Sequence, residues 1–548
     1  MACFRARTAC LALTIAGGLV LTLRGQVADE TRLQIQAIGL PAIDEGLILD
    51  QAHMRDSMID QRSTLRAALV QDRVASTGTL YRAGRVIVKF KDEAAMSDRR
   101  SAVRAASGTG EIAVRPDFAD FDIIRLDVSE DAEQAASVLR ARPEVQYAQV
   151  AHRVHSLLVP NDPLYLSQQW NLPAINMEKA WDIQPAAGSA ITVAVIDSGM
   201  AYQNFTITAT LPAFTDAGGR RYPALGKVTI PYSAAPQLVS PTGTSRIVAP
   251  RDFVNGTTTP LDFEGHGTHV SGTIGQLTND AVGTAGVAFN VKLMPIKVLA
   301  SEWDLLFAGI QNISNVGGSD DDVARGIRYA ADNGAKILNL SLGSSGPATC
   351  AANPNQVDCS PVIEAAMRYA VGKGCFITVA GGNEFEDIDP LYGKNPTSVL
   401  AEIASRIPGV VSVAAIDRSR DHAFYSSTGS YIELAAPGGS SRSTPVAGIV
   451  QQTFDSNFTD TFLLSPAQFR APRFDVLAYE PYQGTSMAAP HVAGVAAMLM
   501  QQGITDPAAI EDILEKTAVD LGTPGRDNTF GFGLVDARAA LRGLGLAR

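Results

Sequence analysis

The stretch Val193–Gly199, VAVIDSG, decides the fold of most of this 548-residue chain. Four consecutive apolar residues lead into Asp197, and Ser198 and Gly199 then turn the chain. A continuous apolar run indicates a strand that is buried on both faces, as in a parallel sheet covered by helices. Asp197 then stands at the carboxyl end of a strand, where open α/β sheets gather their chemistry. On its own, this pattern is also that of an aspartate that caps a turn.

Runs of this kind recur along the chain. They occupy Ile191–Ile196, Val291–Leu299, Ile337–Leu342, Cys375–Ala380 and Val410–Ile416. Helical patterns separate them, as expected for βα units. We therefore predict an α/β domain over residues 159–548, built on a doubly wound, mostly parallel sheet with helices on both faces.

A small α+β module is predicted over residues 84–158, before the large domain. Its strand-like and helix-like segments are Arg85–Phe90, Asp92–Ala106, Phe121–Val128, Glu130–Arg140 and Val145–Val150. Their order, with a helix after the first and the second strand, fits a small ferredoxin-like fold. Residues 29–83 are polar and are predicted to be a leader extension or linker.

The first 28 residues have the pattern of a signal peptide. Arg5 and Arg7 precede the apolar run Leu11–Leu23, which is short for a membrane span. An uncleaved anchor is the alternative, because the cleavage site near Ala28 is weak. We predict an exported protein, extracellular or periplasmic, with no other membrane segment.

Charge and cysteine content indicate which partners, cross-links and metals to expect. The formal net charge is −11 and no Lys/Arg-rich run occurs, which disfavours nucleic acid as a partner. Cys350 and Cys359 flank a short loop and are predicted to form a disulfide, as suits an exported protein. Cys375 opens an apolar strand and is predicted to be a buried thiol. No Cys/His spacing is typical of zinc.

Two further segments supply reactive side chains. His266, in GHGTHVSG (265–272), begins a predicted helix and is a candidate general base, while His269 is interpreted as structural. Ser486, in GTSMAAPHVAG (484–494), opens a helix that is apolar on all sides and therefore buried. A serine there can be an N-cap or, at the positive end of the helix dipole, a nucleophile. His491 lies inside that helix and is interpreted as structural.

Together these segments place Asp197, His266 and Ser486 in the order Asp…His…Ser. The order and the three local motifs resemble those of the subtilisin-like serine proteases. The resemblance implies a triad in which His266, oriented by Asp197, activates Ser486. It also implies that Asn383, in AGGNE (380–384), donates to the oxyanion.

The resemblance has further implications for binding. Ser341, Leu342 and Gly343 would pair with the substrate backbone, with Gly381 and Gly382 as further substrate-binding residues. Residues 85–150 are similar to the inhibitory propeptide of the family. The expected protein is a secreted, self-processed serine endopeptidase that acts on polypeptides, is inhibited by its own propeptide and needs no organic cofactor.

Two other functions compete with this expectation. A pseudoprotease would only bind peptides, but the triad and oxyanion residues are all present. An esterase or lipase of the α/β-hydrolase class would need GxSxG with its histidine last, whereas Ser486 comes last here.

The family's structural calcium is a further expectation. Asp162, Asn279 and Thr284 fall at positions similar to ligands in some members. The segment that usually supplies one carboxylate is missing, and Asp216 is the candidate replacement.

A last hypothesis concerns the residue P1, which supplies the scissile carbonyl. By similarity, Glu402 would lie near the base of the P1 pocket and favour Lys or Arg. The alternative is that Glu402 is a solvated loop residue.

Overall fold

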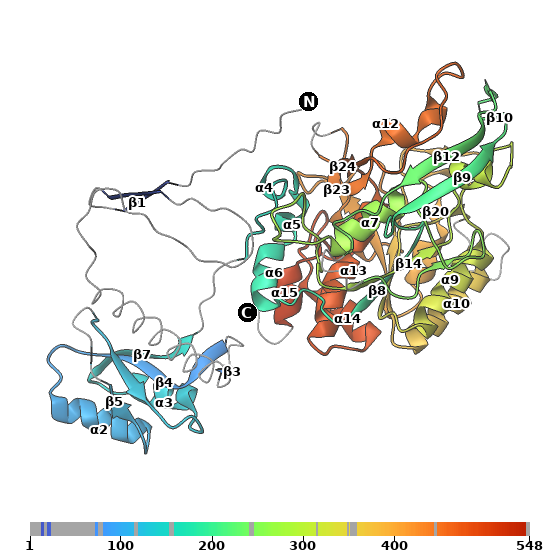
Figure 1. The fold of residues 1–548 in the computed structure, drawn as a ribbon. Coiled ribbons are helices and arrows are strands. Elements are labelled where there is room, and N and C mark those ends of the chain that lie inside the picture. Colours follow the sequence, from blue (N-terminus) through green and yellow to red (C-terminus); the bar gives the residue numbers. More distant parts are fainter. Residues whose placement is uncertain are drawn as a thin grey trace. The chain divides into compact units, whose positions relative to one another are not determined.

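The structure is a computed structural model that describes only part of the chain. The described residues are 12–15, 19–22, 72–74, 80–113, 115, 119–152, 158–216, 218–239, 246–313, 316–347, 350, 359–442 and 447–543. The chain divides into two compact units, residues 1–153 and 154–548, and each is described by itself (Figure 1). The predicted signal and leader lie largely outside the described residues, apart from β1 (Ala12–Ile15), β2 (Leu19–Thr22), β3 (Asp72–Val74) and the start of β4.

The first unit contains an antiparallel sheet with two helices. Its further elements are β4 (Leu80–Phe90), α2 (Met96–Ala106), β5 (Glu111–Ile112), β6 (Asp122–Arg125), α3 (Ala132–Arg140) and β7 (Val145–His152). The strand order is β3-β4-β6-β5, and β7 also pairs with β4. Alternate strand residues such as Val86, Val88 and Ile124 face the helices and are buried with Leu139. The predicted small α+β module is confirmed.

The second unit is built on a seven-stranded sheet in the order β13-β14-β8-β15-β17-β21-β22, and every neighbouring pair is parallel. The strands are β8 (Thr192–Asp197), β13 (Arg251–Asp252), β14 (Lys292–Lys297), β15 (Ile337–Leu340), β17 (Phe376–Ala380), β21 (Val410–Ile416) and β22 (Leu434–Pro437). The five predicted strands are confirmed. The outer strands β13 and β22 were missed, because two and four residues are too short to show a period.

Helices cover both faces of this sheet. Val193 and Val195 face one core with α6 (Met177–Ile183), α7 (His266–Gly275), α13 (Thr485–Gln501), α14 (Pro507–Thr517) and α15 (Ala537–Arg542). Ala194 and Ile196 face the other core with α9 (Asp320–Asp332), α10 (Pro361–Gly372) and α11 (Val399–Ala404). The doubly wound fold is therefore confirmed (Figure 1).

Short elements complete the unit. Within the described part of this unit, five antiparallel strand pairs lie outside the main sheet. Two of them are β9 (Phe205–Leu211) with β12 (Gly226–Tyr232), and β10 (Phe214–Thr215) with β11 (Arg221–Tyr222). The other three are β16 (Ser345–Gly346) with β20 (Thr397–Ser398), β18 (Ile388–Asp389) with β19 (Gly393–Lys394), and β23 (Ile449–Phe454) with β24 (Leu477–Tyr482). The short helices are α4 (Tyr165–Gln168), α5 (Asn171–Ala174), α8 (Glu302–Phe307), α12 (Ser456–Thr459) and the 3₁₀ helix η2 (Thr461–Leu463).

The cysteine predictions are confirmed. Cys350 and Cys359 form a disulfide, and Cys375 is a free, buried thiol whose Sγ donates to the carbonyl of Ala335. In the part of the chain that the structure describes, no helix is long and apolar enough to cross a lipid bilayer.

Candidate active site

Asp197 and His266 form a hydrogen-bonded pair at the carboxyl end of β8. Asp197 is fully buried, and its Oδ1 lies 2.7 Å from His266 Nδ1. The main-chain N–H of Ser198 also donates to this Oδ1, at 2.7 Å. With Nδ1 held in this way, His266 is fixed in one ring orientation and its Nε2 remains for proton transfer.

The pair shifts the titration of His266. Burial alone would lower the pKa of His266, because it disfavours the charged imidazole. The Asp197 carboxylate acts in the opposite direction through its charge and its hydrogen bond, and the charge of Glu264 adds to it. Together they outweigh burial and raise the pKa of His266 to about 9. The imidazole is thus a stronger base than an isolated histidine.

The chain approaches itself closely where α7 starts. A Cβ on Gly267 would lie 2.2 Å from the carbonyl oxygen of Gly199, so only glycine fits. Gly199 itself has φ of 119° and packs against Pro260. These glycines let α7 start directly over the end of β8, which brings His266 to Asp197.

Ser486 lies in the first turn of α13, after Gly484. Helix α13 is buried along nearly its whole length, as predicted from its apolar sequence. The hydroxyl of Ser486 donates to the carbonyl of Ser341 at 3.1 Å, and Ser341 Oγ donates to the Ser486 carbonyl at 2.7 Å. Among the described residues no hydrogen bond joins Ser486 to His266, so Oγ would have to turn from Ser341 towards His266 before reaction.

Asn383 is exposed and oriented beside Ser486. Its Oδ1 accepts hydrogen bonds from the N–H and the hydroxyl of Thr485, both at 2.9 Å. Because Oδ1 is held there, Nδ2 is left as a donor without a partner among the described residues. The N–H of Ser486, in the first helical turn, is a second donor without a partner within the helix.

Two adjoining clefts lie in this region, and Ser486 lines the smaller one. One, of about 130 Å³, is lined by Ala380, Gly382, Asn383, Glu384, Ser398, Thr485 and Ser486, and the other, of about 420 Å³, contains His266 and Glu264. Both share Leu342, Gly343 and Ser344, which follow β15 and are partly or fully exposed. Leu342 and Gly343, predicted to bind substrate, therefore line both clefts. Ser341 contributes main-chain groups, since its side chain faces α13, and Gly381 is buried against Val413.

Asp262 holds the turn before α7, and no sequence motif predicted this role. It is fully buried, and its Oδ1 accepts from Ser198 Oγ at 3.0 Å and from Gly265 N at 2.8 Å. Its Oδ2 accepts from the N–H and the hydroxyl of Thr268, at 2.9 and 2.6 Å. This carboxylate joins the turn after Asp197 to the turn before His266.

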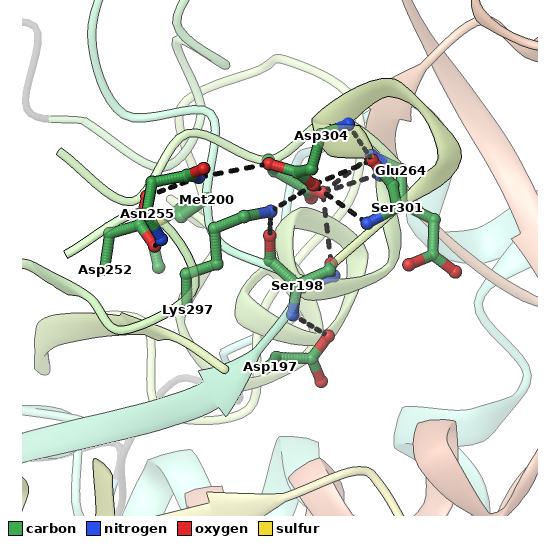
Figure 2. Close-up of polar contacts among 12 residues, drawn as sticks. Asp197, Ser198, Met200, Asp252, Asn255, Glu264, Lys297, Ser301 and Asp304 are labelled. Atoms are coloured by element: carbon green, nitrogen blue, oxygen red, sulfur yellow. Dashed lines mark hydrogen bonds and ion pairs between the residues drawn. The ribbon is translucent and has the colours of Figure 1, made fainter. Parts of the chain in front are cut away.

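Lys297 is a second residue that sequence reasoning missed. It faces Asp197 in the register of β14 with β8, and its side chain is fully buried. Nζ donates to the carbonyl of Ser198 at 2.6 Å and lies 3.0 Å from Asp304 Oδ2 (Figure 2). Asp304 also accepts from the N–H and hydroxyl of Ser301, which caps α8. A lysine at the carboxyl end of a buried strand was the available signal.

The two other histidines of these motifs are structural, as interpreted. His269 Nε2 donates to the carbonyls of Ile449 and Glu480, at 2.9 and 3.0 Å, and its ring stacks on Tyr482. His491 contacts Met487 O and Asn171, both at 2.8 Å. Burial lowers the pKa of His269 to about 3 and that of His491 to about 4, so both remain neutral.

The predicted calcium residues are only partly brought together. Buried Asp162 accepts from the N–H groups of Asn279 and Asp280, at 2.8 and 3.4 Å. Burial, and the Asp280 carboxyl beside it, raise the pKa of Asp162. Gln237 Nε2 donates to Asp280 at 3.2 Å, whereas its buried Oε1 has no partner among the described residues. Thr284 instead hydrogen-bonds Gln276 and Gln451 through Oγ1, at 2.6 and 2.9 Å.

Two expectations about acidic residues are wrong. Asp216 pairs with Arg220 at 2.7 Å in the turn between β10 and β11, so it does not replace a calcium ligand. Glu402 lies on α11 with 5% exposure, and its carboxylate pairs with Arg406 at 2.6 Å. It lines neither cleft and is not a solvated loop residue, because α11 buries it beside a cation that neutralises it.

Comparisons with known proteins agree with this arrangement. Residues 188–533 match the subtilase family, and residues 68–150 match the fervidolysin N-terminal prodomain. The chain is 30% identical over 440 residues to an extracellular protease of Xanthomonas campestris, covering 77% of this chain and 63% of that protein. It is 27% identical over 462 residues to a thermophilic serine proteinase of Bacillus sp. (strain AK1), covering 84% and 88%.

A solved structure, fervidolysin from Fervidobacterium pennivorans, is described as a keratinolytic enzyme related to subtilisin. It matches with 25% identity and a TM-score of 0.44, over 84% of this chain and 61% of that one. Because the family match spans most of the chain, this protein belongs to the subtilase family of subtilisin-like serine proteases.

Proposed function

We propose that this chain is a serine endopeptidase that cleaves peptide bonds through an acyl-enzyme. The observation that carries the proposal is the 2.7 Å hydrogen bond between His266 Nδ1 and buried Asp197, where His266 lines one of two adjoining clefts and Ser486 lines the other. Family membership supports the reaction type.

The mechanism follows from the roles of these groups. His266 takes the proton of Ser486 Oγ through Nε2 as Oγ attacks the peptide carbonyl carbon. Asn383 Nδ2 and the Ser486 N–H donate to the oxygen that becomes negative, and Asp197 stabilises the imidazolium. The imidazolium then gives its proton to the leaving amine, and water, activated by His266, releases the acyl group.

Loss of the nucleophile or of the oxyanion donor tests this mechanism. Ser486→Ala should lower kcat by about 10⁶-fold and Asn383→Ala by about 10²–10³-fold, magnitudes taken from the same groups in subtilisin. Thr517→Ala, on the outer helix α14, is the matched control and should keep normal activity. Full activity in Ser486→Ala would contradict the proposal, and binding without cleavage by the wild type would favour the pseudoprotease.

Self-processing and export belong to the same proposal. The match of residues 68–150 to a protease prodomain supports an inhibitory role for the first unit and its removal during maturation. The similarity to a relative named an extracellular protease supports secretion. The separate core of this unit, with Val86 and Leu139, supports an inhibitor that keeps its own fold. Ser486→Ala, secreted from a host without other proteases, should remain a full-length precursor. Intact-mass measurement should give the mass of the mature enzyme for the wild type from such a host, and the mass of the full precursor for the variant.

A structural calcium ion is the last part of the proposal. Calcium prefers oxygen ligands, and three such groups lie beside the predicted Asn279: the carboxylates of Asp162 and Asp280, and Gln237 Oε1, which has no partner within the described part of the chain. The ion would join Asp162, near the start of the second unit, to the loop after α7. Thr284 could take part only if it gave up Gln276.

A further inference from the structure

The larger cleft, which His266 lines, has both apolar and acidic walls. Its volume is about 420 Å³, and its apolar walls include Leu299, Val323, Ile363 and Leu400. Two carboxylate residues, Glu264 and Asp320, also line it, and no Lys or Arg is among its described lining residues. The cleft therefore offers an apolar surface and negative charge to whatever enters it.

Glu264 has a fixed backbone and a free carboxylate. Its N–H donates to buried Asp262 at 3.0 Å, which anchors it two residues before His266. The side chain is exposed, and the described residues give its carboxylate no hydrogen bond or ion pair. Figure 2 shows it directed away from the Lys297–Asp304 cluster. Asp320 differs, because Ser360 donates to it at 2.5 Å.

The course of a bound peptide links this cleft to one substrate position. On the proposed function, the substrate backbone pairs with Ser341–Gly343 and places its P1 side chain in the small cleft beside Asn383. Side chains of an extended peptide alternate, so the preceding residue, P2, points to the opposite side. That side is lined by His266 and Glu264.

We propose that the cleft selects a Lys or Arg side chain at P2, with its methylene stem on the apolar wall and its cation on the Glu264 carboxylate. Long basic side chains suit such a site, because they bury their stems and keep the charge at the rim. A partly exposed ion pair of this kind discriminates by about tenfold in kcat/KM.

The test compares peptides that differ only at P2, carrying Lys, norleucine or Glu, cleaved by the mature wild type and by Glu264→Gln at pH 9. Partial desolvation raises the pKa of Glu264 to about 7, so it is ionised there. The Lys/norleucine ratio of kcat/KM should be about ten in the wild type and near one in the variant. The ratio cancels any general effect of the substitution on His266. Asp512→Asn, an exposed carboxylate outside the cleft, is the control and should keep the wild-type ratio.

Each outcome decides the question. A ratio near one in the wild type, or a wild-type ratio in Glu264→Gln, overturns the inference and leaves the proposed peptidase activity standing. A wild type that cleaves none of the peptides overturns the proposed function, and the inference with it. Raising the salt concentration should lower the wild-type ratio and leave that of the variant unchanged, because salt screens exposed charges.

Discussion

The ammonium nitrogen of Lys297 lies 3.0 Å from a carboxylate oxygen of Asp304, and both side chains are almost fully withdrawn from solvent. The same nitrogen donates to the carbonyl of Ser198, directly after Asp197. The pair therefore ties the strand end that carries Asp197 to the N-terminal turn of α8. Buried ion pairs are costly to form, but breaking one partner leaves an uncompensated charge.

Lys297→Met should destabilise the protein by about 3–5 kcal/mol, because it leaves Asp304 buried without its cation. The double variant Lys297→Met/Asp304→Leu should recover much of this loss. Urea unfolding in the Ser486→Ala background, which prevents self-digestion, measures both. A single variant that is as stable as its parent would show that the pair does not hold this part of the fold.

The His266–Asp197 pair predicts opposite pH trends for stability and activity. The pKa of about 9 in the folded protein exceeds the ordinary value of about 6.5. The charged pair therefore stabilises the fold fully below about pH 6.5, and this contribution is lost as the pH rises through about 9. Catalysis needs the neutral imidazole, so kcat/KM should rise over the same interval.

Melting curves of Ser486→Ala and Ser486→Ala/Asp197→Asn between pH 6 and pH 10 check the stability trend. The Asp197 variant should lose the pH dependence assigned to His266. A kcat/KM profile of the wild type that is already flat above pH 6.5 would contradict the raised pKa.

Calcium removal should lower the melting temperature of the full chain. An ion that binds only the folded state stabilises it by mass action, by about 3–4 kcal/mol at 100 to 1,000 times Kd. Asp162→Asn should abolish the effect of EDTA, whereas Asp216→Asn should retain it. Identical melting curves with EDTA and with calcium would contradict the prediction of a structural calcium ion.

The disulfide should contribute measurably to stability. Cys350 and Cys359 are nine residues apart, and closing so short a loop restricts the unfolded chain by about 2–3 kcal/mol. Cys350→Ser/Cys359→Ser should unfold at correspondingly lower urea concentration, while Cys375→Ser serves as a control for losing a buried thiol. An unchanged midpoint in the double variant would contradict this.

Local sequence patterns predicted the positions of the main candidate site residues in their elements. They did not predict contacts between residues of distant elements. Asp197, His266 and Ser486 each stand where a strand ends or a helix begins, and those points have sequence signals within a few residues. The partners of Lys297 and Asp262 come from other elements, and no local pattern says which elements will meet. Glu402 was misjudged for a different reason: its partner Arg406 is only four residues away, but α11 has six residues and too short a period to predict a helix there.

The central claim is that Ser486 is the nucleophile of a working peptidase, and active-site labelling tests it most directly. The wild type should react with a fluorophosphonate probe, and peptide mapping by mass spectrometry should place one adduct on Ser486. His266→Ala should greatly slow labelling, because the serine then lacks its base. An unlabelled Ser486 in a properly folded protein, or an adduct on another residue with peptidase activity intact in Ser486→Ala, would contradict the account.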